Sequence, residues 1–343
     1  MITHFIMLGV YVLVDSFGRT IDYLRISVTE RCNFRCVYCM PNTPMDIGDE
    51  SLDVSLESVL SFIKVAINEG VKKIRITGGE PLLRSKIVEF IASICQIAPY
   101  IDIALTTNGF LLAPLAQDLK NAGLKRINIS LDSLKKENIK CISKRDGLDK
   151  ILLGIQAAHK AGLKIKLNMV PLRTINDSEI IEILEYAIRL GVMVRYIEFM
   201  ENIHAKSEIR GLKLPDILAH IRSKYTANLF EKEIVGPAIL FKIPQEEIKQ
   251  KLNCILGGDY IFGVIAPHNN DFCKTCNRIR LSSEGKLIPC LYHENAIDIK
   301  EEMLQENTEE ILERLKLCIQ TKPEKNDWNE DIISKRAFYQ TGG

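Results

Sequence analysis

Residues 23–41 read YLRISVTERCNFRCVYCMP, a strand-like run that leads into three cysteines, Cys32, Cys36 and Cys39. Their CxxxCxxC spacing can aim three thiolates at one centre. Three thiolates leave such a centre one coordination position short, whereas four ligands usually close a structural zinc or iron–sulfur site. Thiolates are soft ligands that suit zinc, copper(I) or iron–sulfur clusters, so the spacing alone predicts an open metal centre without naming the metal.

Around this stretch, the first 200 residues repeat a unit that consists of an amphipathic helix, a glycine and an alternating strand. Glycine suits the left-handed residue that commonly ends a helix. Alternation of helices and strands predicts a parallel sheet with right-handed crossovers. The six predicted strands lie at residues 23–29, 71–77, 101–107, 124–131, 163–170 and 192–199.

These strands are apolar on one face and polar on the other. Parallel strands covered by helices on both faces are almost entirely apolar, so the polar face indicates an interior cavity. We therefore predict an α/β fold, an incomplete barrel of six βα units, in preference to a one-sided sheet with its polar face in water. The polar residues are Arg25, Ser27, Thr29, Arg75, Thr77, Asp102, Thr106, Asn128, Ser130, Lys166 and Asn168.

The repeat ends near Met200, and a different pattern follows. Residues 201–343 predict two helices, at 215–225 and 308–320, and short strands at 239–243, 260–266 and 278–289, the last with a turn at its middle. We therefore divide the chain into a partial barrel with an N-terminal extension, residues 1–200, and an α+β region, residues 201–343, that packs on the barrel mouth.

Composition and charge set further limits. The 343 residues are 46% hydrophobic, enough for a sizeable core, and 45 basic against 44 acidic side chains give a net charge of +1. This balance gives no bulk electrostatic reason to bind nucleic acid or an anionic membrane. The apolar run from Met1 to Val14 lacks a signal-peptide pattern and is too short to span a bilayer. It predicts either an extra strand or a true start at Met7, and the protein is expected to be cytoplasmic.

A second cysteine group, Cys273, Cys276 and Cys290, combines a CxxC motif with a third cysteine. On spacing alone it suits either a zinc site completed by His268 or His293, or an iron–sulfur cluster. The other four cysteines lie in apolar surroundings and are expected to be small buried side chains. They are Cys95, Cys141, Cys254 and Cys318.

The first motif, with Tyr38 before its last cysteine, resembles the radical S-adenosylmethionine family, in which three cysteines hold a 4Fe–4S cluster whose fourth iron chelates S-adenosylmethionine. Residues 273–281, CKTCNRIRL, and residues 285–291, GKLIPCL, resemble the GTP 3′,8-cyclase family, which begins molybdenum cofactor biosynthesis. In that family the second cysteine group holds another 4Fe–4S cluster, which contacts guanine. Further matching segments are DSFGR at 15–19, ITGGEP at 76–81, TTNG at 106–109, ISLD at 129–132, EFM at 198–200 and the terminal Gly342-Gly343. Thr341 and residues 201–204 depart from the family pattern.

The resemblance implies a role for individual residues. It assigns two 4Fe–4S clusters to Cys32, Cys36, Cys39, Cys273, Cys276 and Cys290, and S-adenosylmethionine contacts to Tyr38, Gly79, Ser130 and Met200. It assigns GTP contacts to Arg25, Arg75, Thr106, Lys166, Arg278, Ile279 and Arg280, with Arg278 and Arg280 also taken as catalytic. Buried cations are costly unless an anion meets them, and a triphosphate supplies that anion.

The resemblance also implies the reaction and its participants. Reductive cleavage of S-adenosylmethionine gives a 5′-deoxyadenosyl radical that abstracts the ribose C3′ hydrogen of GTP, so that C3′ attacks guanine C8. An external electron donor and the next enzyme of the pathway are the implied partners, and a homodimer is left open. Two alternatives stand beside this interpretation: a radical S-adenosylmethionine enzyme that acts on a peptide, and a zinc- or cluster-binding interaction module without catalysis.

Overall fold

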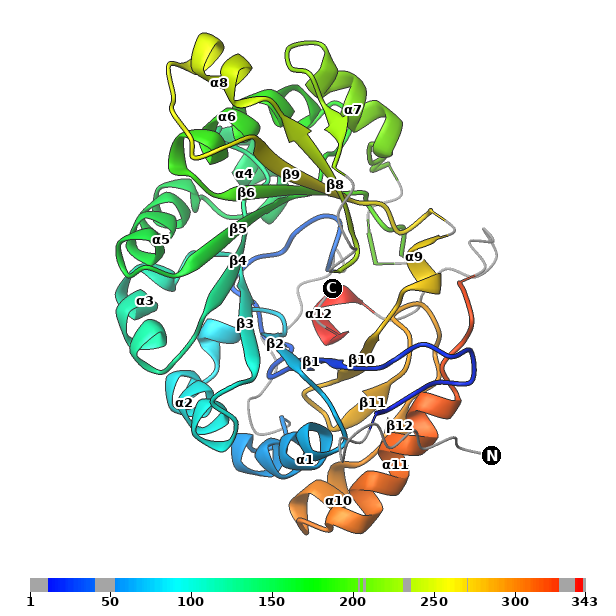
Figure 1. Ribbon diagram of the computed structural model, residues 1–343. Helices are drawn as coiled ribbons and strands as arrows, with labels where there is room; N and C mark the ends of the chain where they lie inside the picture. Colours follow the sequence, from blue (N-terminus) through cyan, green and yellow to red (C-terminus); the bar gives the residue numbers. More distant parts are fainter. Residues whose placement is uncertain are drawn as a thin grey trace.

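The structure is a computed structural model that describes residues 12–40, 53–202, 204–205, 208–230, 236–269, 271–326 and 337–341. Six parallel strands pair in chain order and curve into an open barrel (Figure 1). They are β1 (Tyr23–Ser27), β2 (Lys73–Thr77), β3 (Asp102–Thr107), β4 (Arg126–Ser130), β5 (Lys164–Met169) and β6 (Met193–Ile197). The predicted incomplete barrel of six βα units is confirmed.

Helices cover the outside of this barrel (Figure 1). They are α1 (Leu56–Asn68), α2 (Ile87–Ile97), α3 (Leu112–Asn121), α4 (Lys136–Ser143), α5 (Leu148–Lys160) and α6 (Ile180–Leu190), with short 3-10 turns η2 (Pro81–Leu83) and η3 (Asp177–Glu179). The apolar strand residues lie under the helices, where Ile26, Ile76 and Leu167 are fully buried. Alternation along each strand then directs the polar residues into the barrel, as the sequence predicted.

The C-terminal part of the chain extends the sheet at both edges. Strand β10 (Arg278–Leu281) pairs in parallel with β1, and β9 (Tyr260–Ile265) pairs in parallel with β6. Antiparallel strands β11 (Lys286–Ile288), β12 (Ile297–Asp298), β8 (Ala238–Ile243) and β7 (Asn228–Leu229) follow outward. The edges of an open sheet present unpaired backbone groups, which these strands satisfy. The resulting sheet has twelve strands among the described residues and stays unclosed.

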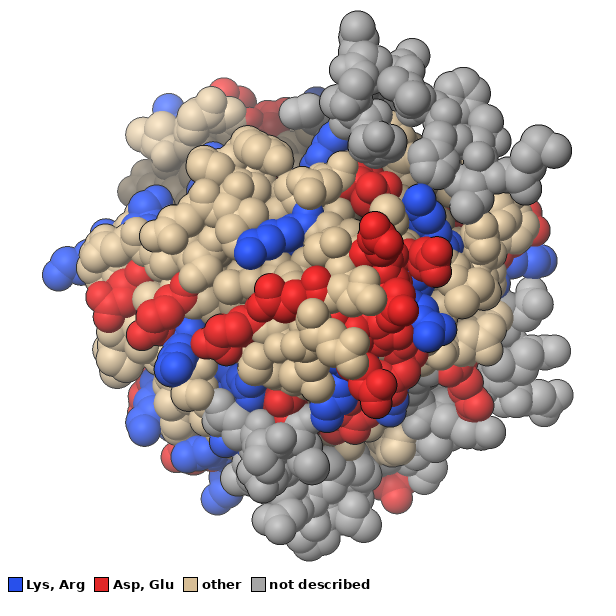
Figure 2. Space-filling view, turned by 90° about the horizontal axis from the view of Figure 1, so that it is seen from below, with Lys and Arg blue, Asp and Glu red and all other residues tan. Residues whose placement is uncertain are grey.

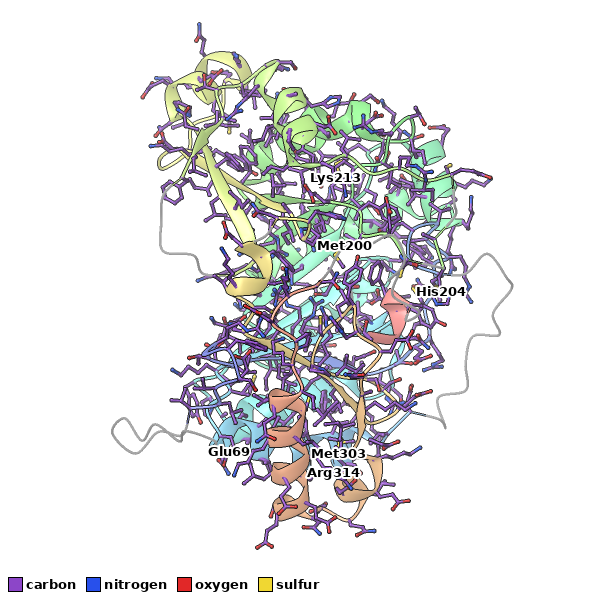
Figure 3. All side chains as sticks on the ribbon, turned by 90° about the vertical axis from the view of Figure 1, so that its right-hand side faces the viewer. Glu69, Met200, His204, Lys213, Met303 and Arg314 are labelled. Atoms are coloured by element: carbon purple, nitrogen blue, oxygen red, sulfur yellow. The ribbon has the colours of Figure 1, made fainter. Side chains whose placement is uncertain are left out.

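The remaining helices belong to this part. They are α7 (Leu214–Arg222), α8 (Gln245–Leu252), α9 (Asp271–Lys274), α10 (Lys300–Leu304), α11 (Thr308–Gln320) and α12 (Phe338–Thr341). Figure 3 views the barrel from the side and shows α9 and α12 toward its opposite ends. None of the helices described is both long and apolar enough to cross a membrane. Most of the Met1–Val14 run and both terminal glycines lie outside the described residues.

The expectation for the scattered cysteines was wrong for Cys141, which is exposed. Helix α4 turns Ile139, Ile142 and Ser143 inward, so the intervening Cys141 falls on its outer face. Cys318 is buried as expected, whereas Cys95 and Cys254 are only partly buried.

Candidate active site

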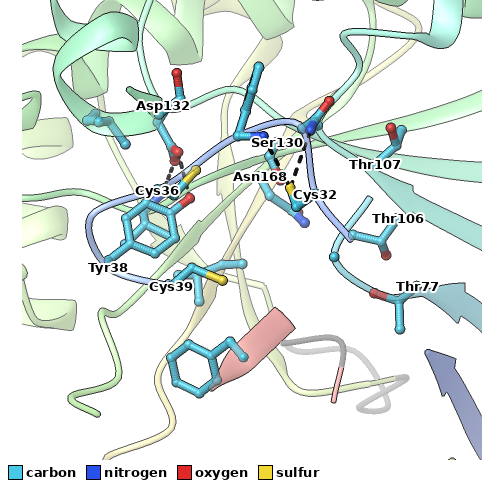
Figure 4. Close-up of a pocket in the computed structure, with 18 of the residues that line it drawn as sticks. Cys32, Cys36, Tyr38, Cys39, Thr77, Thr106, Thr107, Ser130, Asp132 and Asn168 are labelled. Carbon is cyan, nitrogen blue, oxygen red and sulfur yellow. Dashed lines mark hydrogen bonds between the residues drawn. The ribbon is translucent and has the colours of Figure 1, made fainter. Parts of the chain in front are cut away.

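The first cysteine group lies where the barrel strands end. Cys32, Cys36 and Cys39 follow β1 and line one cavity of about 210 Å³ (Figure 4). Two backbone bonds hold their loop against the end of α4, because Arg35 N donates to Ser143 O at 2.8 Å and Val37 N donates to Ile142 O at 2.9 Å. The strand end and the helix end therefore fix where the three thiols point.

Burial sets the protonation of these thiols. It raises the pKa of Cys32 to about 11, with Glu80 adding to the effect, and that of Cys39 to about 12. The pKa of Cys36 is raised by burial and then by Asp132. Metal ligation requires thiolates, and a bound cationic centre deprotonates its thiol ligands. Three soft donors that line one buried cavity fit a 4Fe–4S cluster, whose iron would supply the positive charge that stabilises the thiolates.

Tyr38 is fixed by a buried network that the sequence did not predict. Its hydroxyl donates to Asp132 Oδ2 at 2.7 Å, and Val170 N donates to Asp132 Oδ1 at 2.9 Å. The Asn176 amide in turn donates to Asp132 O at 2.7 Å. Burial raises the pKa of the Asp132 carboxyl to about 6. Asp132 belongs to the matching ISLD segment, and this was the only signal for its role in the sequence.

The turn at Gly79 and Glu80 completes this end of the barrel. Gly79 N donates to Thr29 O at 2.8 Å, and a Cβ on Gly79 would lie 2.3 Å from Arg31 O, so only glycine fits there. Glu80 is fully buried and accepts hydrogen bonds from Thr107 Oγ1 at 2.7 Å and Asn108 N at 2.8 Å. Burial raises its pKa to about 7. The turn is thereby held rigidly beside the cysteine loop.

A second cavity, of about 230 Å³, lies where the barrel strands begin, and cations dominate its lining. Among the described residues that line it, the one carboxylate is that of Asp102, which accepts two hydrogen bonds from Arg126. Arg75 Nε has no hydrogen-bond partner among the described residues, and burial lowers the pKa of Lys166 to about 8. The basic side chains lining this cavity are Arg25, Lys73, Arg75, Arg126, Lys166, Arg195, Arg278, Arg280 and Lys322. Arg195, Arg280 and Lys322 are buried and the other six are partly buried, and cations gathered in this way favour an anionic ligand.

Arg195 is the main lining residue that the sequence interpretation missed. Its guanidinium donates to Asn128 Oδ1 at 2.8 Å and to Asn168 Oδ1 at 2.7 Å, and only 8% of the residue is exposed. The signal was present, because Arg195 is a charged residue in the otherwise apolar stretch 192–197 of the sixth predicted strand.

The second cysteine group lies at this same end, opposite the first group. Cys273, Cys276 and Cys290 all line the second cavity, beside Arg278 and Lys322. Burial would raise the pKa of Cys276, but Arg278 and Lys322 lower it to about 6. These cations therefore favour the thiolate that a cluster requires.

Long-range contacts fix the backbone around this second group. The buried ammonium of Lys322 donates to Arg278 O at 2.8 Å and to Pro289 O at 2.7 Å. Arg19 donates to Cys273 O at 2.9 Å from far along the chain. His268, one candidate for a zinc ligand, instead lies 2.9 Å from Glu198 Oε2 through its Nδ1.

The two cavities meet inside the barrel. Thr106, Asn168, Ile197 and Met200 line both of them, and Figure 3 shows Met200 near the middle of the molecule. The other predicted residues divide between the cavities. Tyr38, Gly79 and Ser130 line only the first, and Arg25, Arg75, Lys166, Arg278 and Arg280 line only the second. Ile279 is fully buried in the hydrophobic core, so only its backbone is available to a ligand.

Comparison with known proteins defines the class and then the family. Residues 26–187 match the Radical SAM superfamily, and residues 192–328 match the family described as Molybdenum Cofactor Synthesis C. The protein is therefore a radical S-adenosylmethionine protein. A GTP 3′,8-cyclase of Helicobacter pylori (strain 26695) is 50% identical over 96% of this chain and 100% of its own length. One of Campylobacter jejuni (strain 81116) is 48% identical with the same coverage. The chain belongs to the GTP 3′,8-cyclase family.

Solved structures support the fold. Streptococcus suis SuiB bound to S-adenosylmethionine superimposes with a TM-score of 0.61 at 15% identity, over 82% of this chain and 64% of SuiB. This chain thus spans less than two thirds of SuiB. The enzyme anSMEcpe with bound AdoMet gives a TM-score of 0.56 at 17% identity, over 94% of this chain and 84% of that protein.

Proposed function

We propose that this protein cyclises GTP to (8S)-3′,8-cyclo-7,8-dihydroguanosine 5′-triphosphate with S-adenosylmethionine and a reductant, the first step of molybdenum cofactor biosynthesis. The observation that carries this proposal is the pair of three-cysteine groups at opposite ends of one barrel, with a cationic cavity beside the second. Family membership supports the same activity.

At the first end, we assign Cys32, Cys36 and Cys39 to one 4Fe–4S cluster. When bound, this cluster supplies the electron that cleaves S-adenosylmethionine and so starts the radical chemistry. The chain's own contribution is positioning. Asp132 holds the Tyr38 ring by the 2.7 Å hydrogen bond, and the Gly79 turn leaves space for a ligand against the loop. Ser130 and Met200 complete the lining from the ends of β4 and β6.

At the second end, we assign Cys273, Cys276 and Cys290 to the other 4Fe–4S cluster. Arg25, Arg75 and Lys166 bind the triphosphate, because guanidinium and ammonium groups suit phosphate oxygens. Arg278 and Arg280 are two residues apart on β10, so both side chains project into the cavity. Thr106 lies where the cavities meet, which suits a contact with the ribose.

Binding GTP at two separate points would align its ribose with the radical generated at the first cluster. A reactive carbon abstracts a hydrogen only from a near-attack position, and a misplacement of ~1 Å can cost about a hundredfold in rate. Anchoring GTP at its triphosphate and at its base leaves the ribose little freedom. The cationic cavity also favours GTP over a peptide as the substrate.

The remaining assignments concern the setting of the reaction. We propose an external one-electron donor, a following enzyme that takes the cyclised nucleotide, and a cytoplasmic location. We also propose that the chain divides at residue 200 into a partial barrel and a C-terminal region, and that the C-terminal region binds the second cluster and the substrate. The oligomeric state, including a homodimer, is left to direct measurement.

Anaerobic incubation with S-adenosylmethionine, GTP and dithionite tests the proposal. We expect about eight irons per chain for two 4Fe–4S clusters. We further expect 5′-deoxyadenosine and the cyclised nucleotide in equal amounts. Zinc in place of iron would instead support an interaction module, and 5′-deoxyadenosine without any GTP-derived product would point to another substrate.

A further inference from the structure

We propose that an acidic one-electron carrier protein docks on the outer surface beside the first cysteine group and reduces the cluster there. The surface consists of Lys140, Lys144, Arg145 and Lys150, and we call it the basic face. The inference rests on the proposed function, because it assumes that Cys32 and its neighbours hold a redox cluster.

The basic face carries an excess of positive charge. Residues 135–150 contain six basic and three acidic side chains, Glu137, Asp146 and Asp149. Lys135 and Lys136 pair with carboxylates, whereas the basic-face residues form no ion pair with any described carboxylate. All four basic-face residues are exposed.

The opposite charge covers another part of the molecule. Figure 2 views the molecule from below and shows acidic side chains gathered in a band across this face. Helices α10 and α11 lie on this side, and together with the turn between them they carry five exposed carboxylates, at Glu301, Glu306, Glu309, Glu310 and Glu313. An acidic partner is repelled from such a face and attracted to a basic one, which orients its approach.

An aromatic pair connects the basic face to the cluster loop. The guanidinium carbon of Arg145 lies 4.3 Å, and Lys150 Nζ 4.5 Å, from the centroid of the Phe110 ring. Phe110 meets Phe34 edge to face with 5.6 Å between ring centroids. Phe34 N donates to Cys32 Sγ at 3.4 Å. The basic face therefore contacts a continuous chain of packed groups that ends on a cluster ligand.

The local backbone is suited to this close packing. A Cβ at Gly147 would lie 3.0 Å from Phe34 and 3.1 Å from Phe110, so a glycine lets the two rings approach. Arg145 also donates to Asn33 O at 3.1 Å, which ties the surface loop to the cysteine loop. Ile139 and Ile142 line the first cavity from the inner side of α4, so one helix, roughly 10 Å across, separates this cavity from the outer face.

The transfer itself is simple. One electron leaves the reduced carrier and enters the first cluster, so the carrier is oxidised by one electron and the cluster is reduced by one. No bond forms or breaks between the two proteins. The chain has only to bring the carrier to the correct side of the barrel.

The test uses reduced flavodoxin, an acidic one-electron carrier, and the holoenzyme with charge reversals. The double variant Lys140→Glu/Lys144→Glu changes the basic face without touching the residues that contact Phe110. The matched control is Lys64→Glu/Lys249→Glu, which makes the same change in net charge at exposed positions on α1 and α8. Dithionite serves as a small reductant that needs no docking surface.

We expect the basic-face variant to reduce its first cluster about tenfold more slowly with flavodoxin at low salt, because electrostatic steering is lost. Flavodoxin affinity measured by titration should fall with it. Reduction by dithionite should keep the wild-type rate, and the control variant should stay within about twofold of wild type.

Three outcomes would overturn the inference: an unchanged flavodoxin rate, an equal loss with dithionite, or a wild-type flavodoxin rate that does not fall as salt is raised. Screening over about 8 Å at physiological ionic strength should weaken a charge-guided encounter. A wild-type first cluster that dithionite cannot reduce would be different, because it would contradict the proposed function itself.

Discussion

The two cysteine groups occupy opposite electrostatic surroundings. The first lies among buried acidic groups, where Glu80 and Asp132 add to the burial that raises the pKa values of Cys32 and Cys36. The second lies among cations, where Arg278 and Lys322 lower the pKa of Cys276 to about 6. Similar ligands are therefore placed in two environments that differ in charge.

The difference in local charge fits two different functions for the two cysteine groups. Negative surroundings disfavour adding an electron, so they suit a centre that must be a strong reductant once it is reduced. Positive surroundings attract an anionic substrate and stabilise thiolates, which suits a centre that anchors GTP. This difference supports the proposal that the first group serves radical generation and that the second serves substrate orientation.

The largest effect is expected for Cys36→Ala, which should abolish 5′-deoxyadenosine formation because two thiols remain where three are needed. The matched control is Cys141→Ala, since Cys141 is exposed on the outer face of α4. It should keep full activity. 5′-Deoxyadenosine quantified by chromatography decides the matter, and an undiminished amount from Cys36→Ala would remove the first group from radical generation.

Arg75→Ala should weaken GTP binding much more than S-adenosylmethionine binding, because only the second cavity loses a cation. Truncating one partner of a buried charged contact typically costs about 2–5 kcal/mol. Lys72→Ala, an exposed change next to β2, is the control. Equilibrium dialysis of both ligands measures the split. An equal loss of affinity for GTP and for S-adenosylmethionine would indicate a folding defect. It would contradict the assignment of the two ligands to separate cavities.

A smaller effect should follow pH through Lys166. Burial, with Arg195, Arg126 and Arg75 nearby, lowers the pKa of Lys166 to about 8, and Asp102 opposes this weakly. The ammonium form binds phosphate, so it is mostly present below that pKa and is lost as pH rises through it. GTP affinity should therefore fall between pH 7.5 and 9, approaching about tenfold per unit above the pKa. In Lys166→Met this component of the pH dependence should be absent, and an unchanged profile would exclude Lys166 from the effect.

An effect on stability, not on radical generation, is expected for Lys322→Met, which removes two hydrogen bonds to Arg278 O and Pro289 O. Hydrogen bonds from charged donors contribute about 1.5–3 kcal/mol each, so the melting temperature of the anaerobic holoenzyme should fall by several degrees. Lys316→Met, on α11, is the control. Reduction of the first cluster by dithionite should be unaffected. A loss there as well would mean that Lys322 supports the whole barrel.

The sequence predicted the parts of the site that follow from local periodicity. Alternation along single strands placed Arg25, Arg75 and Lys166 on an inward face, and the structure shows them in one cavity. The sequence pattern could not show that the second cysteine group lies at the opposite end of the barrel from the first. That placement depends on β10 pairing in parallel with β1, a contact between residues about 255 apart. Periodicity carries no information about such a distant partner.

Networks of buried polar groups were harder still to predict. Asn176 and Glu179 stand three residues apart in the sequence, a spacing that by itself predicts a capping box at the start of a helix. Asn176 makes no cap bond but donates to Asp132 O and Val170 O, while Glu179 accepts hydrogen bonds from Ser133 and Asn138. Both residues support the Tyr38–Asp132 contact from outside the motif. Spacing alone cannot distinguish a cap from such a network.

The most direct test of the divided labour is the Cys290→Ala protein, with its first cluster confirmed by electron paramagnetic resonance. Cys254→Ala, a change at a partly buried cysteine outside both groups, is the control. 5′-Deoxyadenosine and cyclised nucleotide are measured in the same reaction with S-adenosylmethionine, GTP and dithionite. The account predicts that Cys290→Ala still cleaves S-adenosylmethionine but forms no cyclised nucleotide, because the purine is no longer anchored. Normal cyclised product from Cys290→Ala would contradict it and would make the second group structural.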